Sequence, residues 1–444
     1  MCRSVGSASR SAVACAVYLF ICTAAVAEEG GREVANRLRA LAHTTQVELN
    51  GDLNRMRIDS LRRAIAEAPN WSRAARLHLE LGDQLLRAGR TRESIDAFRY
   101  VQHELVRRKS TAPLRATWPL HAFLGLAHMR LAEQENCLEL HNTESCLLPI
   151  SPAGVHALQE SARQALFEYG QVLAQRPDDG AARWLLNILH MTLGDYPHGV
   201  PAAWRIDPEV FASEGDMVRL RDVASALGVD ALGLSGGGIV EDFDGDGDLD
   251  IMASSWGLDD PLQLFLNGGD GTFTQRGAAA GLSEQLGGLN MVHADYDNNG
   301  YADVLVLRGA WWNREGHHPN SLLRNEGGRF VDTTVETGLL SFHPTQTAAW
   351  GDYDNDGFVD LYIGNESNDW ERHPCELFNN REGVKFVERA QSEGVDNVGY
   401  VKGVAWGDYD NDGDIDLFLS RMGQVNALYR NDGEQGFKIG RAHV

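Results

Sequence analysis

The sequence predicts a multidomain α + β protein, with an α-helical half followed by a half built from repeated β units. Two observations carry this expectation. Residues from about 31 to 217 show an apolar period of 3.6 residues with Ala, Leu and Arg enriched, which is typical of amphipathic helices. After them, one nine-residue acidic loop occurs four times, with starts 53, 57 and 56 residues apart. Spacing this regular indicates a structural repeat.

The acidic loops have the composition of sites for a hard cation. Positions 1, 3, 5 and 9 carry carboxylate or amide oxygens, and Gly at position 6 permits the sharp turn that wraps an ion. Like charges about 4 Å apart repel by roughly 4 kcal/mol, so a cation is needed to close the loop. We predict one structural Ca²⁺ per loop. The predicted ligands, with position 7 included, are Asp242, Asp244, Asp246, Asp248 and Asp250; Asp295, Asp297, Asn299, Tyr301 and Asp303; Asp352, Asp354, Asp356, Phe358 and Asp360; and Asp408, Asp410, Asp412, Asp414 and Asp416.

Other interpretations of the loops fit less well. Mg²⁺ demands octahedral geometry and keeps its waters, and the loops lack the thiols and histidines of a zinc site. An EF-hand needs a Glu at position 12 and flanking helices, whereas position 12 here is apolar and a β-prone run follows each loop: LDIMAS, ADVLVL, VDLYIG and IDLFLS. A solvated acidic turn without metal is the remaining alternative, and four copies in register weigh against it.

The loops resemble the calcium loops of FG-GAP/VCBS repeats, the blades of integrin-type β-propellers. After each loop comes a segment similar to the family's LxxNxGxGxF pattern, at residues 264–273, 322–330, 377–386 and 428–437. Connectors similar to DVAxxxGL occur at 221–229 and 331–339. The resemblance covers residues 218–438 and implies a partial β-propeller of four blades, where a full ring of the family has seven. Asn299 departs from the pattern, and the lost charge should weaken the second site.

The helical half resembles tetratricopeptide repeats. Small and large packing residues of one unit fall at Leu81-Gly82, Leu85, Gly89, Ser94, Phe98 and Val101. A second unit starts at Leu124-Gly125 and continues, after an insertion, at Ala165, Tyr169, Val172 and Pro177. A peptide-binding groove and a plain helical domain that packs on the blades are both open interpretations. The order of tetratricopeptide-like helices and FG-GAP blades is similar to exported ASPIC/UnbV proteins, relatives of the cartilage acidic protein family. Those proteins end in a C-terminal ASPIC/UnbV domain, which we expect a truncation to have removed here.

The two ends of the chain carry further expectations. Residues 1–27 have a basic start, an apolar stretch of about 16 residues and an A-x-A cleavage site, which predicts a secretory signal peptide. A retained signal anchor is the alternative. Residues 439–444, IGRAHV, match a translated sequencing adapter, so we expect an artefact that follows a truncation. The predicted domains are therefore the signal at 1–27, the helical domain at 28–217, the blades at 218–438 and the artefact at 439–444.

Three cysteines remain after the signal. In an oxidising compartment Cys137 and Cys146, nine positions apart in one predicted loop, are the expected disulfide pair, and Cys375 is left over. His141 lies between the first two and leaves a metal or haem site as the alternative, although the spacing is not C-x-x-C-H.

Composition and motifs bound the function. The formal net charge of −23, of which the loops' 17 aspartates are the largest part, argues against nucleic acid and anionic membranes as partners. No G-x-S-x-G, H-E-x-x-H, Walker or Rossmann motif occurs, so we expect no enzyme. The blade histidines do not follow the blade period, and His293 is interpreted as a packing position. Trp311-Trp312, in a long loop, either binds a ligand or covers a blade edge.

We therefore expect an exported interaction or scaffold protein, secreted, periplasmic or at the cell surface, without a transmembrane span after signal cleavage. Its partner would be a protein or carbohydrate. One alternative is an enzyme of exported carbohydrate or secondary metabolism that uses the propeller channel or a missing C-terminal domain. The other is cell-surface adhesion. A channel cluster with His and Glu from several blades would favour the enzyme, and an exposed Trp311-Trp312 loop would favour adhesion or ligand capture.

Overall fold

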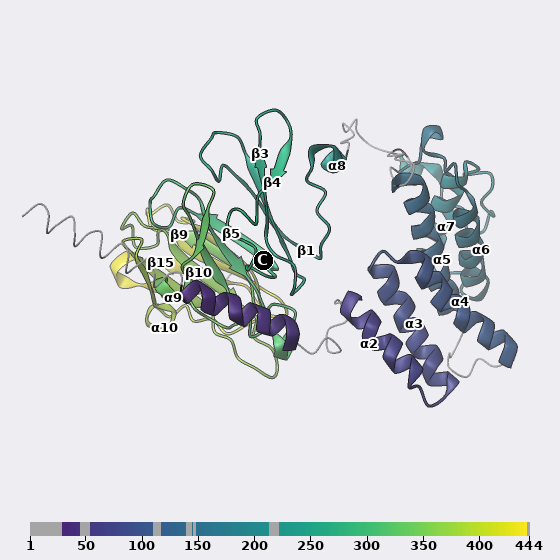
Figure 1. Cartoon of the computed structure of the whole chain (residues 1–444), viewed down its shortest axis with the longest axis horizontal. Helices are drawn as coiled ribbons and strands as arrows, with labels where there is room; N and C mark the ends of the chain where they lie inside the picture. Colours follow the sequence, from purple (N-terminus) through teal and green to yellow (C-terminus); the bar gives the residue numbers. More distant parts are fainter. Residues whose placement is uncertain are drawn as a thin grey trace, which may run out of the picture. The chain divides into compact units, whose positions relative to one another are not determined.

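The computed structural model describes residues 29–44, 54–109, 117–138, 144, 148–212 and 222–441. The chain divides into two compact units. One comprises residues 47–222 and is called here the helical unit, and the other comprises residues 1–46 with 223–444 and is called the sheet unit (Figure 1). Among the described residues, none of the helices has the length and apolar character needed to cross a membrane.

The helical unit consists of sequential helices that pack against their neighbours along the chain. Several ends follow from local sequence: the Asn70 side chain accepts the N–H of Arg73 at the start of α3, the Asp179 side chain accepts that of Ala182 at the start of α7, and Gly194 ends α7 with a left-handed backbone. The elements are α2 (Asn54–Ala66), α3 (Trp71–Arg87), α4 (Thr91–Arg108), α5 (Trp118–Glu133), the π-helix η2 (Gln134–Leu138), η4 (Pro152–Gly154), α6 (Glu160–Gln175), α7 (Gly180–Leu193) and η5 (Pro208–Phe211).

Two helix pairs pack a large side chain on a glycine. A Cβ added at Gly82 in α3 would lie 2.4 Å from the Phe98 ring of α4. In the same way, a Cβ at Gly125 in α5 would lie 3.0 Å from the Tyr169 ring of α6. All four residues are among the predicted small and large packing positions. Phe98 and Tyr169 are also core residues of two separate apolar clusters, so each glycine lets two helices approach closely at a buried ring.

The sheet unit holds four antiparallel sheets, each a four-stranded meander in sequence order, called here blades 1 to 4. They are β1 (Ser235–Glu241), β2 (Asp250–Ser255), β3 (Gln263–Asn267) and β4 (Phe273–Gln275); β5 (Asn290–Ala294), β6 (Asp303–Leu307), β7 (Ser321–Asn325) and β8 (Phe330–Asp332); β9 (Thr345–Gly351), β10 (Asp360–Asn365), β11 (Glu376–Arg381) and β12 (Lys385–Glu388); and β13 (Val401–Gly407), β14 (Asp416–Arg421), β15 (Ala427–Asn431) and β16 (Phe437–Arg441).

The blades stack on one another in chain order. Each pair of successive blades encloses an apolar core. Met252 belongs to the core between blades 1 and 2, Leu305 to that between blades 2 and 3, and Leu417 to that between blades 3 and 4. The first strands of successive blades, β1, β5, β9 and β13, are neighbours and form the inner row. This architecture is consistent with a partial β-propeller, in agreement with the predicted fold class.

Short one-turn helices connect or precede blades, and two of them lie in the predicted connectors at 221–229 and 331–339. They are α8 (Ala224–Leu227), α9 (Thr334–Thr337) and α10 (Ala390–Glu393), and each ends at a glycine with positive φ, at Gly228, Gly338 and Gly394. In an antiparallel meander the first hairpin loop and the third lie on one side, while the second hairpin loop and the connector to the next blade lie on the other. The first side carries the acidic loops and is called the acidic face. The second is called the connector face.

The helix over residues 29–44, called the leading helix, belongs to the sheet unit. It contacts connector-face residues: Arg39 pairs with Glu284, the Arg37 guanidinium lies 4.7 Å from the Phe342 ring centroid, and Gly30 approaches Val335. Figure 1 shows this helix, in dark purple, lying along the sheet unit. The sequence analysis placed these residues with the other helices, in a domain spanning 28–217. The apolar face of the leading helix packs near Trp256 and Leu286 instead.

Several predictions fall on residues that the structure does not describe. The signal over 1–27 lies outside the described residues, and so does Cys146, so its pairing with Cys137 stays a prediction. Cys375 is buried and free. At the other end, Ile439 and Gly440 pair with β15 as part of β16, and 442–444 are outside the described residues. The artefact interpretation of 439–444 also stays a prediction.

Candidate metal sites on the acidic loops

Each acidic loop is the hairpin loop between the first and second strand of its blade. The residue before position 1 pairs with position 9 in the ladder, as Glu241 does with Asp250 and Gly351 with Asp360. The second strands β2, β6, β10 and β14 begin at position 9. The predicted strands after the loops are therefore confirmed, and the loops are closed at their bases by regular sheet pairing.

The position-9 carboxylates form the buried floor of the loops. Asp250, Asp303, Asp360 and Asp416 are at most 1% exposed. One oxygen of each accepts the N–H of position 2 in its own loop, at 3.0–3.1 Å. The other oxygen accepts the N–H of an Asn at or next to the end of the third strand, at 2.6–2.8 Å. These bonds tie the loop to two strands of its own blade.

The position-1 carboxylates organise the turn. In each loop one oxygen accepts the N–H of position 5 and the other accepts the N–H of Gly at position 6, at 2.8–3.2 Å. The glycine is required because its φ is between 90° and 98° in every loop. Position 4 also has a left-handed backbone, at Gly245, Asn298, Asn355 and Asn411, and Asn tolerates this conformation better than most residues.

Carboxylate oxygens converge in all four loops. Three oxygens from three residues lie within 4.8 Å of one another in each cluster. Positions 1 and 3 contribute everywhere, with position 5 as the third member in the first and third loops and position 9 in the second and fourth. The clusters are Asp242, Asp244 and Asp246; Asp295, Asp297 and Asp303; Asp352, Asp354 and Asp356; and Asp408, Asp410 and Asp416.

The remaining predicted ligands lie beside these clusters. The side-chain oxygen at position 5, including those of Asn299 and Asp412, accepts the N–H of position 7 at 2.8–3.0 Å. At position 7, Tyr301 and Phe358 carry no carboxylate, so only their main-chain carbonyls could meet an ion. The Asp414 side chain instead accepts the Asn355 amide of the preceding loop at 2.8 Å. Asp248 also occupies position 7, in the first loop.

The electrostatics of the clusters fit a cation. Burial, with further contributions from the neighbouring carboxylates of the loop, raises the pKa of Asp303 to about 8 and that of Asp360 to about 7. Burial likewise raises the pKa of Asp250 and Asp297. Asp244 Oδ1 is buried without a hydrogen-bond partner. A divalent cation would compensate both the crowded charge and the unpaired oxygen, and an all-oxygen donor set suits Ca²⁺.

Position 2 joins each loop to the next blade. Its aromatic ring packs on a Phe at the start of the following blade's fourth strand or next to it, with centroids 5.6–5.8 Å apart: Phe243 on Phe330, Tyr296 on Phe386, and Tyr353 on Phe437. Its carbonyl accepts an amide hydrogen from the following blade's third strand, from Asn325, Asn380 and Asn431, each at 2.8 Å. The sequence analysis missed this role, although all four loops have an aromatic residue at position 2.

The ligand-binding role predicted for Trp311-Trp312 and the packing role predicted for His293 are only partly met. Trp311 is 47% exposed, whereas Trp312 is 4% exposed and packs on Trp256, with ring centroids 5.0 Å apart. In the inner row, Lys402 of β13 pairs with Glu366 and bonds Gln346 Oε1 at 2.6 Å. His293 differs from its predicted packing role. Its side chain lies at the surface, with Nε2 3.3 Å from a Glu241 oxygen of the preceding blade.

Comparison with known proteins agrees with this geometry. Residues 242–306, which contain the first two acidic loops, match the model of FG-GAP-like repeats. The chain is homologous to cartilage acidic protein 1. It is 27% identical to the Homo sapiens protein over 270 residues, which is 58% of this chain and 39% of the relative. It is 29% identical to the Xenopus tropicalis protein over 189 residues, 40% of this chain and 28% of the relative. The chain thus spans less than half the length of these relatives.

Proposed function

We propose that the sheet unit is a calcium-stabilised β-propeller module of an exported interaction or scaffold protein. The observation that carries the proposal is the convergence of three carboxylates in each of four equivalent loops. Each ion would hold positions 1, 3 and 5 or 9 together and thereby fix position 2, whose ring and carbonyl bind the next blade. Calcium would then act as a structural ion rather than a catalytic one.

The magnitude of this effect is large for a domain. Extracellular calcium modules bind with dissociation constants of about 10⁻⁴ to 10⁻³ M. At about tenfold excess of free Ca²⁺ each site contributes roughly 1.4 kcal/mol, so four sites contribute about 6 kcal/mol. Typical domain stabilities are about 5–15 kcal/mol. The sheet unit should therefore depend on the ion for much of its stability.

Thermal unfolding with and without a chelator tests the proposal. Removing Ca²⁺ should lower the melting temperature of the sheet unit by many degrees and leave the melting of the helical unit unchanged. Mg²⁺ at the same concentration is the matched control and should restore little, because it prefers a rigid octahedral site. Equal melting temperatures of the sheet unit with calcium and with chelator would contradict the proposal.

We propose further that the module works outside the cytoplasm, secreted, periplasmic or at the cell surface, and that its partner is a protein or a carbohydrate. The half-exposed indole of Trp311, which lies 5.4 Å from Lys402 Nζ, favours ligand capture at the connector face. Fluorescence titration with oligosaccharides and peptides tests this candidate, and Trp311→Ala should abolish binding while the exposed Trp184→Ala does not.

The helical unit is proposed to be tetratricopeptide-like. Its two glycine–aromatic contacts support this assignment, and an open hollow of about 520 Å³ between α4 and α5 is lined in part by the apolar side chains of Leu105, Val106 and Leu120. The rival function, an enzyme of exported carbohydrate or secondary metabolism, requires a base beside a nucleophile. Lys402 in the inner row is instead paired with Glu366, which directly follows β10.

A further inference from the structure

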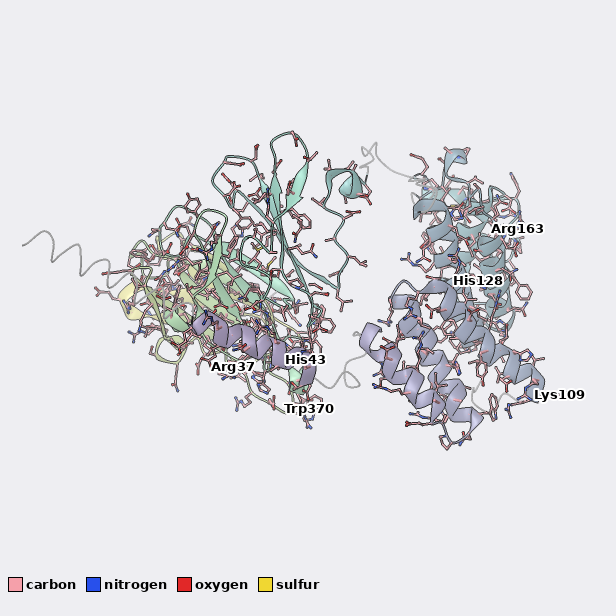
Figure 2. All side chains as sticks on the ribbon, viewed as in Figure 1. Arg37, His43, Lys109, His128, Arg163 and Trp370 are labelled. Atoms are coloured by element: carbon pink, nitrogen blue, oxygen red, sulfur yellow. The ribbon has the colours of Figure 1, made fainter. Side chains whose placement is uncertain are left out.

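Three histidines and a glutamate meet on the connector face, away from the acidic loops. His317 comes from the β6–β7 loop, His343 from the segment between β8 and β9, and Glu371 and His373 from the β10–β11 loop. The ring centroids of His317 and His343 lie 5.5 and 5.2 Å from that of His373. Trp370, which directly precedes Glu371, is labelled at the edge of the sheet unit in Figure 2. The cluster thus assembles side chains from blades 2 and 3.

The hydrogen bonds of His317 indicate which of its ring nitrogens carries a proton and which one faces Glu371 with a lone pair. Its Nδ1 lies 3.3 Å from the Phe342 carbonyl oxygen, which can only accept, so Nδ1 carries the proton. Its Nε2 lies 3.1 Å from Glu371 Oε2. In the neutral imidazole this places a nitrogen lone pair against a carboxylate oxygen. Two acceptors at this distance repel, so the contact requires a proton between them, carried by the ring or by the carboxyl group, or a cation.

His373 presents a second nitrogen to the same oxygen. Its Nδ1 bonds His343 Nδ1 at 2.9 Å, and its Nε2 lies 3.5 Å from Glu371 Oε2. The residue is only 3% exposed and this Nε2 has no hydrogen-bond partner. A buried nitrogen without a partner is costly unless something binds it.

We propose that His317 Nε2, His373 Nε2 and Glu371 form a site for a divalent transition-metal ion such as Zn²⁺. The bond lengths of a tetrahedral zinc site, about 2.0–2.1 Å, place two ligand atoms roughly 3.3 Å apart. Two of the three separations, those of 3.1 and 3.5 Å between nitrogen and oxygen, bracket that value. The two Nε2 atoms lie further apart than the 4.8 Å within which the carboxylates of each acidic cluster converge, with Glu371 Oε2 between them. Closing the set around an ion therefore takes a ring rotation of the half-exposed His317.

His343 acts as a positioning residue in this site. By bonding Nδ1 of His373 it holds the ring with Nε2 directed at the glutamate, as the outer partners of metal-bound histidines do. Two imidazoles and one carboxylate leave a fourth position for water or an anionic ligand. The site is chemically distinct from the acidic loops because imidazole nitrogen selects transition metals, whereas Ca²⁺ takes oxygen ligands.

Calorimetric titration of the untagged full chain with Zn²⁺, in excess Ca²⁺ to fill the acidic loops, tests the inference. Co²⁺ absorption reports the coordination of the same site. We expect one tight equivalent in the wild type. Glu371→Gln and His317→Ala should each abolish it, and His343→Ala should weaken it by about 10- to 100-fold. His317 is half exposed, so its variant should keep the fold, and circular dichroism checks this.

His293→Ala is the matched control, because His293 Nε2 also faces a glutamate oxygen, at 3.3 Å, but is the one histidine paired with that glutamate among the described residues. It should leave the equivalent unchanged. The inference is overturned if the wild type takes up no Zn²⁺, or if His317→Ala binds as tightly as the wild type. It is equally overturned if the cluster responds only to pH, since a doubly protonated His317 would then account for the short contact.

Discussion

The two units of the chain hold their repeated elements together by opposite means. In the helical unit, neighbouring helices fit by shape, with the rings of Phe98 and Tyr169 against Gly82 and Gly125. In the sheet unit, apolar cores between the blades are joined by polar loops whose Asn and aromatic residues reach the next blade. Packing contacts do not depend on ions, whereas the crowded carboxylates bind cations and protons. The difference therefore predicts that cations and pH act on one unit and spare the other.

The largest single-site effect is expected in the helical unit. Phe98→Ala removes a fully buried ring and should lower the free energy of unfolding of that unit by about 3–5 kcal/mol. Urea unfolding followed by circular dichroism measures this loss of free energy, which should be the same in calcium and in chelator. Phe167→Ala, at an exposed position, is the control and should change little. A loss of stability that depends on calcium would contradict the difference between the two units.

In the sheet unit, Asn380→Ala should cost about 2–3 kcal/mol. The Asn380 amide donates to the Tyr296 carbonyl of the preceding blade and to Val359 of its own loop, so the change leaves buried acceptors unpaired. Asn267 has the corresponding place in blade 1, where its side-chain NH₂ donates to the Leu249 carbonyl of the acidic loop in the same blade. Asn267→Ala should cost about 1 kcal/mol. Equal costs in denaturant unfolding would show that the amide between blades adds nothing.

Calcium affinity should rise with pH. Asp303 and Asp360 have pKa values raised to about 8 and about 7, so without metal the folded state holds protons that the unfolded state releases. The calcium-free sheet unit should consequently lose stability as pH rises from about 4 to about 8. Calcium must displace those protons, so binding tightens by up to about tenfold per pH unit for each proton released. Titrations in buffers of different ionisation enthalpy count the protons, and a pH-independent affinity would refute the coupling.

The smallest effect concerns the second loop. Asn299→Asp restores the carboxylate found at position 5 elsewhere and should tighten calcium binding there by about 1 kcal/mol, somewhat offset by loss of the amide bond to the Asn325 carbonyl. Asp356→Asn makes the reverse change in the third loop and should weaken binding similarly. Site-resolved NMR titration distinguishes the two loops. No difference between the loops in the wild type would remove the basis of this prediction.

Local features of the fold were predictable because they depend on nearby residues. The strands after each loop, the turn glycines such as Gly300, and positions 1, 3 and 9 follow from spacing and from the chemistry of aspartate. The position-2 aromatics were visible in the sequence, but their partners are Phe residues one blade further on, such as Phe386 for Tyr296. Only the stacking of blades brings them together.

Other features depend on contacts that no local pattern encodes. Each acidic cluster draws on a single loop and does not itself join successive blades, whereas Asn380 and its equivalents make the links. The leading helix looks like any other amphipathic helix, but it packs on the connector face. The His317, His343 and His373 cluster has no sequence period, because three separate loops supply it.

Counting bound calcium by native mass spectrometry shows whether each acidic loop holds an ion. We expect four ions on the wild-type chain and three on Asp352→Asn, because Asp352 both organises the third loop and contributes to its cluster. Asp270→Asn, an exposed aspartate in the β3–β4 turn, should retain four. A wild-type chain that carries no calcium, or an Asp352→Asn chain with the same count as the wild type, would contradict this expectation.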